Sequence, residues 1–330
     1  MILLNITISN KLISHGIFRL NIFGSMINLD YIKNDAIKLR ERVDMPNTDF
    51  LVRVFSYEQK EAGGVFPLHW HENIEFIYVF GGSMVIECSG NAIEISAGDC
   101  IVINSNEYHG SSYASANLAL YCVMVDMSVL NSRFFDACEE KYIYPVFHNM
   151  IIFKNLIPCN SQFQSYISKI MEEYNNKEKG FELAIKALLY NMIVFLLRNN
   201  VEKVLSARES LIRENNFEKI NNILQYIDEN YMDEIKIADI SQKMGISKFY
   251  LCKLFKKMTG KTITEYVNYV RVREAVALIR ETDISITDVA LTVGFNDANY
   301  FSRIFHSFTN NSPSEIRKTS HQIQINKWHE

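Results

Sequence analysis

The feature that most constrains this chain is a pattern that occurs twice near its C-terminal end. Segments 245–255 and 294–305 each place a glycine before a tyrosine, a basic residue and a phenylalanine, and these three residues align at an offset of 50. Each segment follows a short amphipathic run. Two copies of one unit at this spacing indicate a structural repeat. Two helices joined by a short turn that contains glycine predict a helix-turn-helix unit in each copy.

Local signals predict where the helices of both units begin and end. In the first unit, Gly245 ends one helix, Ser247 caps the next and Gly260 ends it. In the second unit, Ser285 caps a helix that stops at Gly294. The sequence therefore predicts two short helices on each side of a longer connecting segment.

The connecting segment predicts one longer helix. Thr262 and Glu265 have the spacing of a capping box, and apolar residues continue to Leu278. A helix of about 20 residues spans roughly 30 Å, which is close to the length of one DNA turn. The second helix of each unit could then enter successive major grooves on one face of a duplex.

Charge is distributed unevenly along the chain. Between Ser241 and Arg280 there are nine Lys or Arg and two Glu, a local net charge of 9 − 2 = +7, whereas the whole chain carries −4. A basic block in an acidic chain is typical of a surface that binds a polyanion. A solvated basic helix face would give the same count, so the charge alone leaves both interpretations open.

The C-terminal region closely resembles the AraC/XylS family over about 100 residues. The resemblance is carried by Gly-Phe-Asn-Asp at 294–297, Tyr-Phe-Ser-Arg-Ile-Phe at 300–305 and Ser-Pro-Ser-Glu-Ile-Arg at 312–317. It implies a DNA-binding domain of seven helices that usually activates promoters. It also implies double-stranded DNA with operator half-sites as the partner, and RNA polymerase as a further one.

The resemblance carries base-reading and phosphate-contacting roles onto the second helix of each unit and onto the connecting helix. The predicted DNA-binding residues are Lys248, Phe249, Cys252, Lys253, Lys256, Arg271, Asn299, Ser302 and Arg303. For the basic residues, the alternative is again a solvated helix face. The second unit has His306 and Ser307 where the family usually has two lysines. We therefore expect it to bind DNA more weakly, with Arg303 as its main anchor.

The N-terminal half shows two further patterns. Residues 49–127 contain short β-type runs separated by glycine turns every 8–12 residues, which predicts a barrel or sandwich. Residues 128–200 are helical in pattern, and from Phe181 to Leu196 a wide apolar stripe recurs at i, i+3, i+4 and i+7. Core packing is the simpler explanation for any one residue of this stripe, and a homodimer seam is plausible for the helix as a whole.

Histidines and a glutamate have the spacing of the first cupin motif. The sequence has Gly63, five residues, His69-Trp70-His71, three residues, Glu75, six residues and Gly82. The second motif is only partial, with His109 at its histidine position. Side chains alternate along a strand, so His69 and His71 face the interior together. The resemblance to metal-binding cupins implies that His69, His71, Glu75 and His109 converge on one point.

Three interpretations of this cluster remain open. It could bind a small-molecule effector. The resemblance to regulators with sugar-sensing cupin domains implies a carbohydrate as one such effector. It could hold a divalent metal, because three histidines and a glutamate suit Fe, Mn, Ni or Zn, although no cofactor is certain. It could also be a structural remnant. The predicted effector-binding residues are His69, Trp70, His71, Glu75, His109 and Tyr113, and the predicted metal ligands are His69, His71, Glu75 and His109.

These patterns together predict an α+β multidomain protein. Its expected parts are an N-terminal extension (1–48), a cupin-like effector-binding β-barrel (49–127), a helical segment that dimerises (128–200), a linker (201–216), an all-α double helix-turn-helix domain (217–319) and a tail (320–330). The most apolar run, 183–197, is too short to cross a bilayer and contains Lys186, so no membrane is expected. Six scattered cysteines fit free thiols in a reducing cytoplasm, and Met26 is an alternative start.

The predicted function is effector-controlled DNA binding by a transcription regulator, with no catalysis. One alternative is a cupin metalloenzyme, such as an isomerase or dioxygenase, fused to a DNA-binding domain. Another is an architectural DNA-binding protein without an effector, against which the buried histidine cluster argues.

Overall fold

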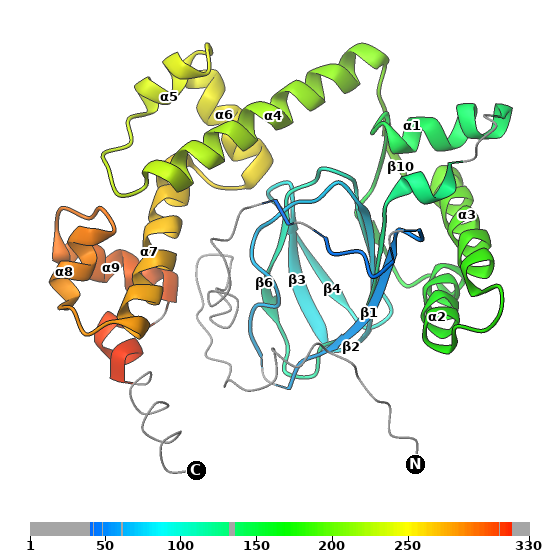
Figure 1. Cartoon of the computed structure of the whole chain (residues 1–330), viewed down its shortest axis with the longest axis horizontal. Helices are drawn as coiled ribbons and strands as arrows, with labels where there is room; N and C mark the ends of the chain where they lie inside the picture. Colours follow the sequence, from blue (N-terminus) through cyan, green and yellow to red (C-terminus); the bar gives the residue numbers. More distant parts are fainter. Residues whose placement is uncertain are drawn as a thin grey trace.

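The computed structural model describes residues 40–41, 43–47, 49–60, 62–131, 136–309 and 311–318. Met26, most of the predicted N-terminal extension and the tail lie outside these residues. Figure 1 shows a central strand-rich domain between helices α2 and α3 on one side and the C-terminal helices on the other. Among the described residues, no helix is both long enough and apolar enough to cross a bilayer.

The strand-rich domain consists of two antiparallel sheets that face each other. The larger sheet has the order β1 (Val52–Glu58), β7 (Ala119–Val125), β2 (Ile74–Gly81), β5 (Cys100–Ile103) and β9 (Leu156–Ile157). The smaller sheet has the order β4 (Asn91–Ser96), β3 (Ser83–Cys88) and β6 (His109–Ala114). Buried side chains such as Ile77, Ile86 and Ile103 fill the space between them. The predicted cupin-like domain is confirmed, although the strand pairing gives two sheets rather than one closed ring.

Helices cover the outer face of the larger sheet. α2 (Ser161–Asn176) and α3 (Phe181–Asn199) share one core with this face, and Ile185, Leu189 and Met192 of the apolar stripe are buried in it. Core packing therefore explains most of the stripe. The predicted helical segment also contains short elements: η2 (Met127–Leu130), η3 (Glu139–Ile143), α1 (Tyr144–Phe147), β8 (Ile151–Phe153) and β9, and β8 pairs with β10 (Val201–Val204).

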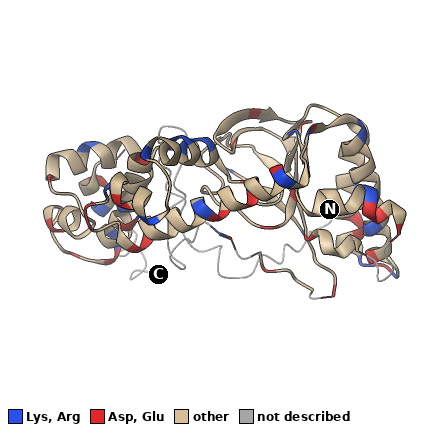
Figure 2. Cartoon of the chain, turned by 90° about the horizontal axis from the view of Figure 1, so that it is seen from above, with Lys and Arg blue, Asp and Glu red and all other residues tan. Residues whose placement is uncertain are grey.

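The predicted linker at 201–216 is not a linker in the structure. Its first residues form β10, and α4 (Ala207–Asn230) then runs without a break into the C-terminal domain. Ser206 and Glu209 form a capping box that begins α4. Figure 2 looks down on α4 and shows acidic and basic residues following one another along it. The linker prediction was wrong because a polar, charge-rich segment that begins with a good N-cap can also form a stable helix with a solvated surface.

The double helix-turn-helix prediction is confirmed. The first unit is α5 (Ile237–Lys243) and α6 (Lys248–Thr259), α7 (Ile263–Glu281) connects the units, and the second unit is α8 (Ile286–Thr292) and α9 (Ala298–Thr309). Residues 313–318 form a further helical turn. Gly245 and Gly294 have φ of 64° and 92°, which is the left-handed conformation expected at both turns. Thr262 and Glu265 form the predicted capping box at the start of α7.

The two turn glycines should differ in how well they tolerate alanine. Both have a left-handed backbone, which costs an L-residue about 1–2 kcal/mol. A Cβ at Gly245 would meet nothing within 4 Å, whereas one at Gly294 would lie 2.5 Å from the carbonyl oxygen of Met232. We therefore expect Gly294→Ala to lower the melting temperature clearly more than Gly245→Ala, as measured by circular dichroism. Equal losses would contradict the close approach at Gly294.

Candidate functional site

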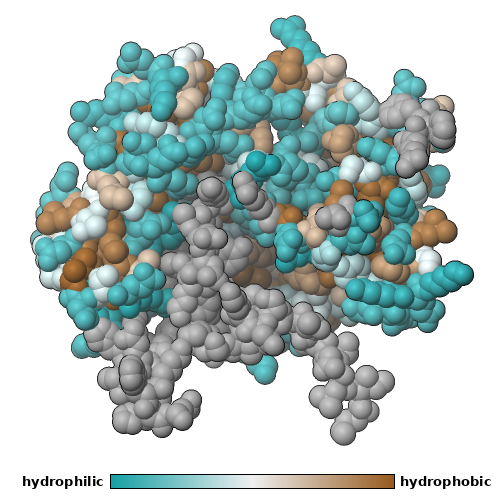
Figure 3. Space-filling model, in the orientation of Figure 1, coloured by the Kyte–Doolittle hydropathy of each residue, from teal (hydrophilic) through white to brown (hydrophobic). Residues whose placement is uncertain are grey.

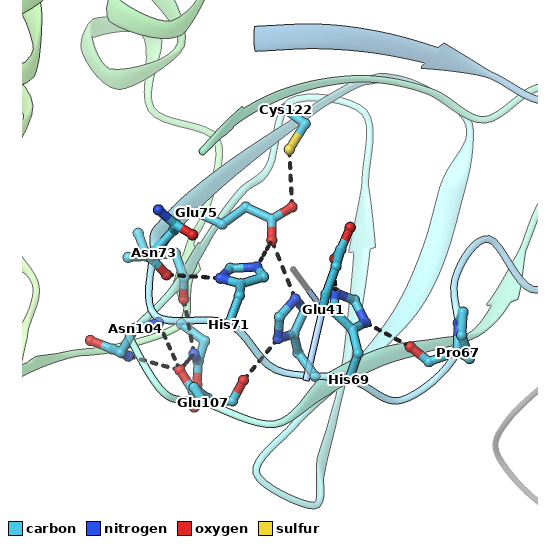
Figure 4. A network of polar contacts seen from close by, with 12 residues as sticks. Glu41, Pro67, His69, His71, Asn73, Glu75, Asn104, Glu107 and Cys122 are labelled. Atoms are coloured by element: carbon cyan, nitrogen blue, oxygen red, sulfur yellow. Dashed lines mark hydrogen bonds and ion pairs between the residues drawn. The ribbon is translucent and has the colours of Figure 1, made fainter. Parts of the chain in front are cut away.

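The structure brings four predicted site residues together between the two sheets. Glu75 points inward from β2, and its Oε2 lies 3.0 Å from His71 Nε2 and 3.2 Å from His109 Nε2. One ring nitrogen from each of His69, His71 and His109 lies within 4.8 Å of the others. His71 and His109 are buried and His69 is nearly so. The period of two along the 69–71 segment places both of its histidines inward, as Figure 4 shows.

In each histidine of the cluster, the ring nitrogen that points away from the cluster, Nδ1, is held by a hydrogen bond to the backbone. In all three rings Nδ1 faces a backbone carbonyl oxygen, so Nδ1 must carry the proton and donate it. The remaining nitrogen, Nε2, then points its lone pair into the cluster whenever the ring is neutral. Second-neighbour carbonyls orient metal-binding histidines in the same way. The acceptors are Pro67 O for His69 (2.8 Å), Asn73 O for His71 (3.0 Å) and Glu107 O for His109 (2.9 Å).

Burial and the neighbouring charges set the ionisation of the cluster. Burial raises the pKa of Glu75, but the hydrogen bonds and charges of His109 and His71 outweigh it, so the pKa lies well below its usual value. Burial, together with the charge on His69, lowers the pKa of His109 to about 4, despite the opposing effect of Glu75. At neutral pH, Glu75 is therefore a carboxylate and His109 is neutral.

With Glu75 ionised and His109 neutral, the contact between these two side chains has no proton to form a hydrogen bond. The Nε2 lone pair of neutral His109 faces a carboxylate oxygen of Glu75, so two acceptors lie 3.2 Å apart. His109 Nε2 is buried and has no hydrogen-bond donor among the described residues. Buried acceptors without a donor are costly. A hydroxyl or ammonium donor, or a cation, placed in the cluster would remove this cost.

Two residues of the cluster were not predicted from the sequence. Glu41 Oε2 lies 3.0 Å from His69 Nε2, and the Cys122 thiol donates to Glu75 Oε1 at 3.0 Å. Burial lowers the pKa of His69, but the hydrogen bond and charge of Glu41 outweigh it and raise the pKa. Glu41 belongs to the predicted extension and no motif marks it. Cys122 could have been inferred, because inward and outward residues alternate along β7.

Two predicted effector-binding residues lie away from the cluster. Trp70 is between two inward histidines and therefore points outward, where it is only 6% exposed and packs edge-on against Phe217 of α4. Tyr113 is 42% exposed on β6, near the end of the strand opposite to His109. The prediction had assigned both rings to the pocket by residue type. Alternation along residues 69–71 excludes Trp70, whereas Tyr113 has the same parity as His109 and faces outward because the pairing of β3 with β6 shifts register between Val85 and Ile86. We remove Trp70 and Tyr113 from the candidate site.

The predicted contacts of the first helix-turn-helix unit share one face of α6. Leu251, Leu254 and Phe255 are buried on the opposite side of the helix. Phe249 is the most exposed large apolar residue described, at 78%. The solvent-facing predicted contacts of α6 are Lys248, Phe249, Cys252, Lys253 and Lys256. Their spacing of i, i+3, i+4 and i+7 from Phe249 matches a single helix face.

The predicted contacts of the second unit also face solvent, on α9. Asn299, Ser302 and Arg303 are exposed, and the Arg303 guanidinium lies over the Tyr300 ring at 5.5 Å. The Ser302 hydroxyl donates to the Ala298 carbonyl, so toward a ligand it offers acceptor lone pairs. Among these three residues, Arg303 alone brings a full positive charge, which agrees with its predicted role as main anchor.

Arg271 has a different environment from the other predicted DNA contacts. Its guanidinium donates to the carbonyl oxygens of Tyr231 (2.7 Å) and Asp233 (2.8 Å) and stacks over the Phe295 ring. Arg271 thereby ties α7 to the connection between α4 and α5 and to the turn of the second unit. A sequence pattern cannot distinguish such an internal tie from a phosphate contact, and we remove Arg271 from the DNA-binding set.

Two family models agree with this division of the chain. A family model described as "Helix-turn-helix domain" matches residues 240–319, and one described as "Cupin domain" matches residues 57–125. The HTH-type transcriptional regulator YdeC of Bacillus subtilis, itself described as uncharacterised, is 24% identical over 78% of this chain and 88% of its own. The HTH-type transcriptional activator RhaS of Enterobacter sp. is 27% identical over 79% and 91%. ToxT of Vibrio cholerae aligns over 80% of this chain and 96% of its own, with 16% identity and a TM-score of 0.41.

The ionisation of His109 predicts a specific dependence of stability on pH. Its pKa is about 4 in the folded protein and near 6.5 when unfolded, so the unfolded chain binds the extra proton first. The stability associated with neutral His109 is therefore lost as pH falls from about 6.5 toward 4. We expect His109→Gln to flatten the decrease in melting temperature between pH 7 and pH 5.

The control for this measurement is His148→Gln, at an exposed histidine on the surface. It should leave the slope of melting temperature against pH as in the wild type. A slope in His109→Gln as steep as in the wild type would show that His109 is protonated in the folded protein.

Proposed function

We propose that this chain, which belongs to the AraC family of helix-turn-helix transcriptional regulators, binds operator half-sites through α6 and α9 and is controlled by a small molecule held in its cupin domain. The observation that carries the proposal is the presence in one chain of two exposed reading faces and a separate buried cluster that lacks a donor. The protein would act in the cytoplasm as a regulator, without catalysis.

The two reading faces support unequal roles in DNA binding. Among its predicted contacts, α6 offers three exposed lysines beside Phe249, which suits attraction to phosphates and close approach to bases. α9 has one exposed cation, Arg303, among its predicted contacts, together with two short polar side chains. We therefore assign most of the non-specific affinity to the first unit, and base discrimination at one half-site to Arg303, since arginine pairs with guanine through two hydrogen bonds.

Loss of Arg303 should weaken binding at one half-site. Duplexes that bind the wild-type protein are first selected from a random library, and their dissociation constants are then measured by fluorescence anisotropy. Arg303→Ala should cost about 1–3 kcal/mol on the selected duplex and relax the base preference at one position.

The matched control is Arg198→Ala, which removes an exposed arginine from α3 in the other domain. It should leave the affinity for DNA unchanged. If Arg303→Ala binds the selected duplex as tightly as Arg198→Ala, the assignment of Arg303 to base reading is wrong.

The cluster supports a polyhydroxylated effector such as a carbohydrate. A ligand hydroxyl could donate to the Glu75 carboxylate or to His109 Nε2, which would satisfy the groups that the protein leaves facing each other. His71 contacts the same Glu75 oxygen as His109 and would complete the site. The relative RhaS is named a transcriptional activator, which supports the proposal that this chain activates promoters and contacts RNA polymerase.

A divalent cation is the second candidate for the same cluster. The fit rests on three histidines with Nδ1–H bound to carbonyls, because this arrangement presents three Nε2 lone pairs beside a carboxylate. His69, His71 and His109 would hold the ion, with the predicted fourth ligand, Glu75, next to His71 and His109. A bound ion would supply positive charge between these groups. The metalloenzyme alternative would need this ion with open coordination positions.

Ligand binding to the cluster should depend on His71. A thermal-shift screen of sugars and of Zn²⁺, Ni²⁺, Mn²⁺ and Fe²⁺ against the wild type should give at least one stabilising compound, since binding to the folded state raises the melting temperature. His71→Gln should abolish that shift, and the exposed-site control His148→Gln should retain it. A shift that survives in His71→Gln would place the ligand elsewhere. A full equivalent of Fe or Mn in the purified protein would favour the metalloenzyme alternative.

We also propose that α3 supports a homodimer. Most of its apolar side chains are buried, but Leu183, Tyr190 and Val194 are exposed and follow one another at i, i+7 and i+11 on its outer side. In Figure 3, apolar atoms reach the surface at the right-hand rim, on the side where Figure 1 places α3. A dimer formed through this stripe would carry two DNA-binding domains to repeated half-sites.

A charge on the outer side of α3 should break this dimer. Leu183 is 73% exposed, so Leu183→Glu should not disturb the fold of one protomer. We expect light scattering after gel filtration to give a dimer for the wild type and a monomer for Leu183→Glu. Leu211→Glu makes the same change at an exposed leucine of α4 and should stay dimeric. A dimeric Leu183→Glu would exclude this stripe as the interface.

A further inference from the structure

Two aromatic residues of the cupin domain pack against the DNA-binding side of the molecule. The rings of Trp70 and Phe217 meet edge-on with centroids 4.5 Å apart, and Tyr108 lies 5.5 Å from the same Phe217 ring. The Tyr108 hydroxyl donates to Asn221 Oδ1 at 2.6 Å. Trp70 and Tyr108 are buried in the same core as the helix-turn-helix residues. We call Trp70, Tyr108 and Gly90 the docking surface.

Gly90 makes the third contact of the docking surface. It lies in the turn between β3 and β4 with φ of 79°, and a Cβ on it would be 2.7 Å from the Cα of Gly260. Gly260 is the C-cap of α6, so this turn meets the end of the first reading helix, backbone against backbone. Glu87 and Lys261 add an electrostatic attraction at the same place.

The segments that form the docking surface also form the polar cluster. Trp70 lies between the inward-facing His69 and His71, and Tyr108 directly precedes His109. The two segments are joined by a pair of backbone hydrogen bonds between His69 and His109, each 2.9 Å long. A movement of either segment that adjusts a histidine to a ligand must therefore also move an aromatic ring that packs on Phe217, because neighbouring side chains of an extended segment share one backbone.

α4 continues this path to the first reading helix. Phe217 and Asn221 contact the cupin domain, whereas the neighbouring Asn216 accepts a hydrogen bond from the Tyr250 hydroxyl of α6 at 2.9 Å. Residues 216–221 of α4 thus contact both the docking surface and α6. In Figure 1, α4 passes above the strand-rich domain and beside α6.

We infer that Trp70, Tyr108 and Gly90 clamp the first helix-turn-helix unit onto the cupin domain and link the state of the His–Glu cluster to the position of α6. The regulatory part of this inference rests on the proposed function, but the clamp itself does not. Packed interfaces of this kind change between discrete arrangements rather than deform continuously, so a small change at the cluster can release or re-form the contact.

The clamp can be tested with the fluorescence of Trp70. The chain has two tryptophans, and replacing the other one in Trp328→Phe leaves Trp70 as the only indole. In this background, Gly90→Ala should push the turn away from Gly260, and acrylamide should quench Trp70 more strongly. Gly180→Ala is the matched control, because Gly180 also has a left-handed φ of 92° but no atom within 4 Å of the added Cβ.

Quenching of Trp70 that is the same in Gly90→Ala as in Gly180→Ala would overturn the clamp. Tyr108→Phe provides a second variant in case Gly90→Ala does not fold, since it removes only the hydrogen bond to Asn221. It should also increase quenching of Trp70, and unchanged quenching in this folded variant would overturn the clamp as well.

The link between the His–Glu cluster and the clamp is tested by a substitution inside the cupin domain. Glu75→Gln removes the carboxylate charge that His71 and His109 share, and it should alter the emission maximum and quenching of Trp70. Glu94→Gln changes an exposed carboxylate of β4 in the same domain and should leave both unchanged. Identical Trp70 signals in Glu75→Gln and Glu94→Gln would overturn the link.

DNA binding separates this inference from the proposed function. Gly90→Ala should change the affinity for the selected duplex relative to Gly180→Ala, and equal affinities would overturn the regulatory part. If the wild-type protein selects no duplex at all, the proposed function fails, whereas the Trp70 measurements still decide whether the clamp and its link to the cluster exist.

Discussion

The alternation of side chains along an extended segment determines how the two halves of this protein relate. Because neighbours point to opposite faces, the residues 69–71 can present two histidines to the interior only by presenting Trp70 to the exterior. The same holds for Tyr108 and His109. A buried polar cluster and an aromatic interdomain contact therefore use the same stretch of backbone, and neither can be repositioned without the other.

The chemical character of the His–Glu cluster follows from a missing hydrogen-bond donor between His109 and Glu75. Glu75 accepts from Cys122 and faces His71 and His109, yet neutral His109 has no proton to give it. A purely structural histidine pair would be expected to settle with its donors and acceptors matched, since unmatched buried groups are costly. The mismatch argues against a structural remnant and for a site that is completed by a donor or a cation.

Much of the fold could be predicted from the sequence, because its signals are local. Glycine turns, caps and the internal repeat placed the helix-turn-helix helices, and motif spacing identified Glu75 and the three histidines. The parts that were missed depend on contacts between distant segments. Nothing near Glu41 indicates that it meets His69, and Arg271 has the same residue type whether it contacts phosphate or the carbonyl of Tyr231. The linker was missed because α4 is polar on most of its surface, while Phe217 and its apolar neighbours become buried only in the assembled protein.

The position of α4 explains why a chain with separate cupin and helix-turn-helix domains need not have a flexible connection. A flexible linker would let the cupin domain restrain the reading helices only through their local concentration, whereas a continuous helix with Phe217 buried between domains transmits displacement directly. The contact of Gly90 with Gly260 at the end of α6 then sets where that displacement arrives. The contacts described for Trp70, Tyr108 and Gly90 fall on α4 and on the end of α6, whereas helix α9 of the second unit packs on α7 and α8. Control of this kind would therefore act first on the basic unit that we expect to supply most of the attraction to DNA, and reach Arg303 only through α7.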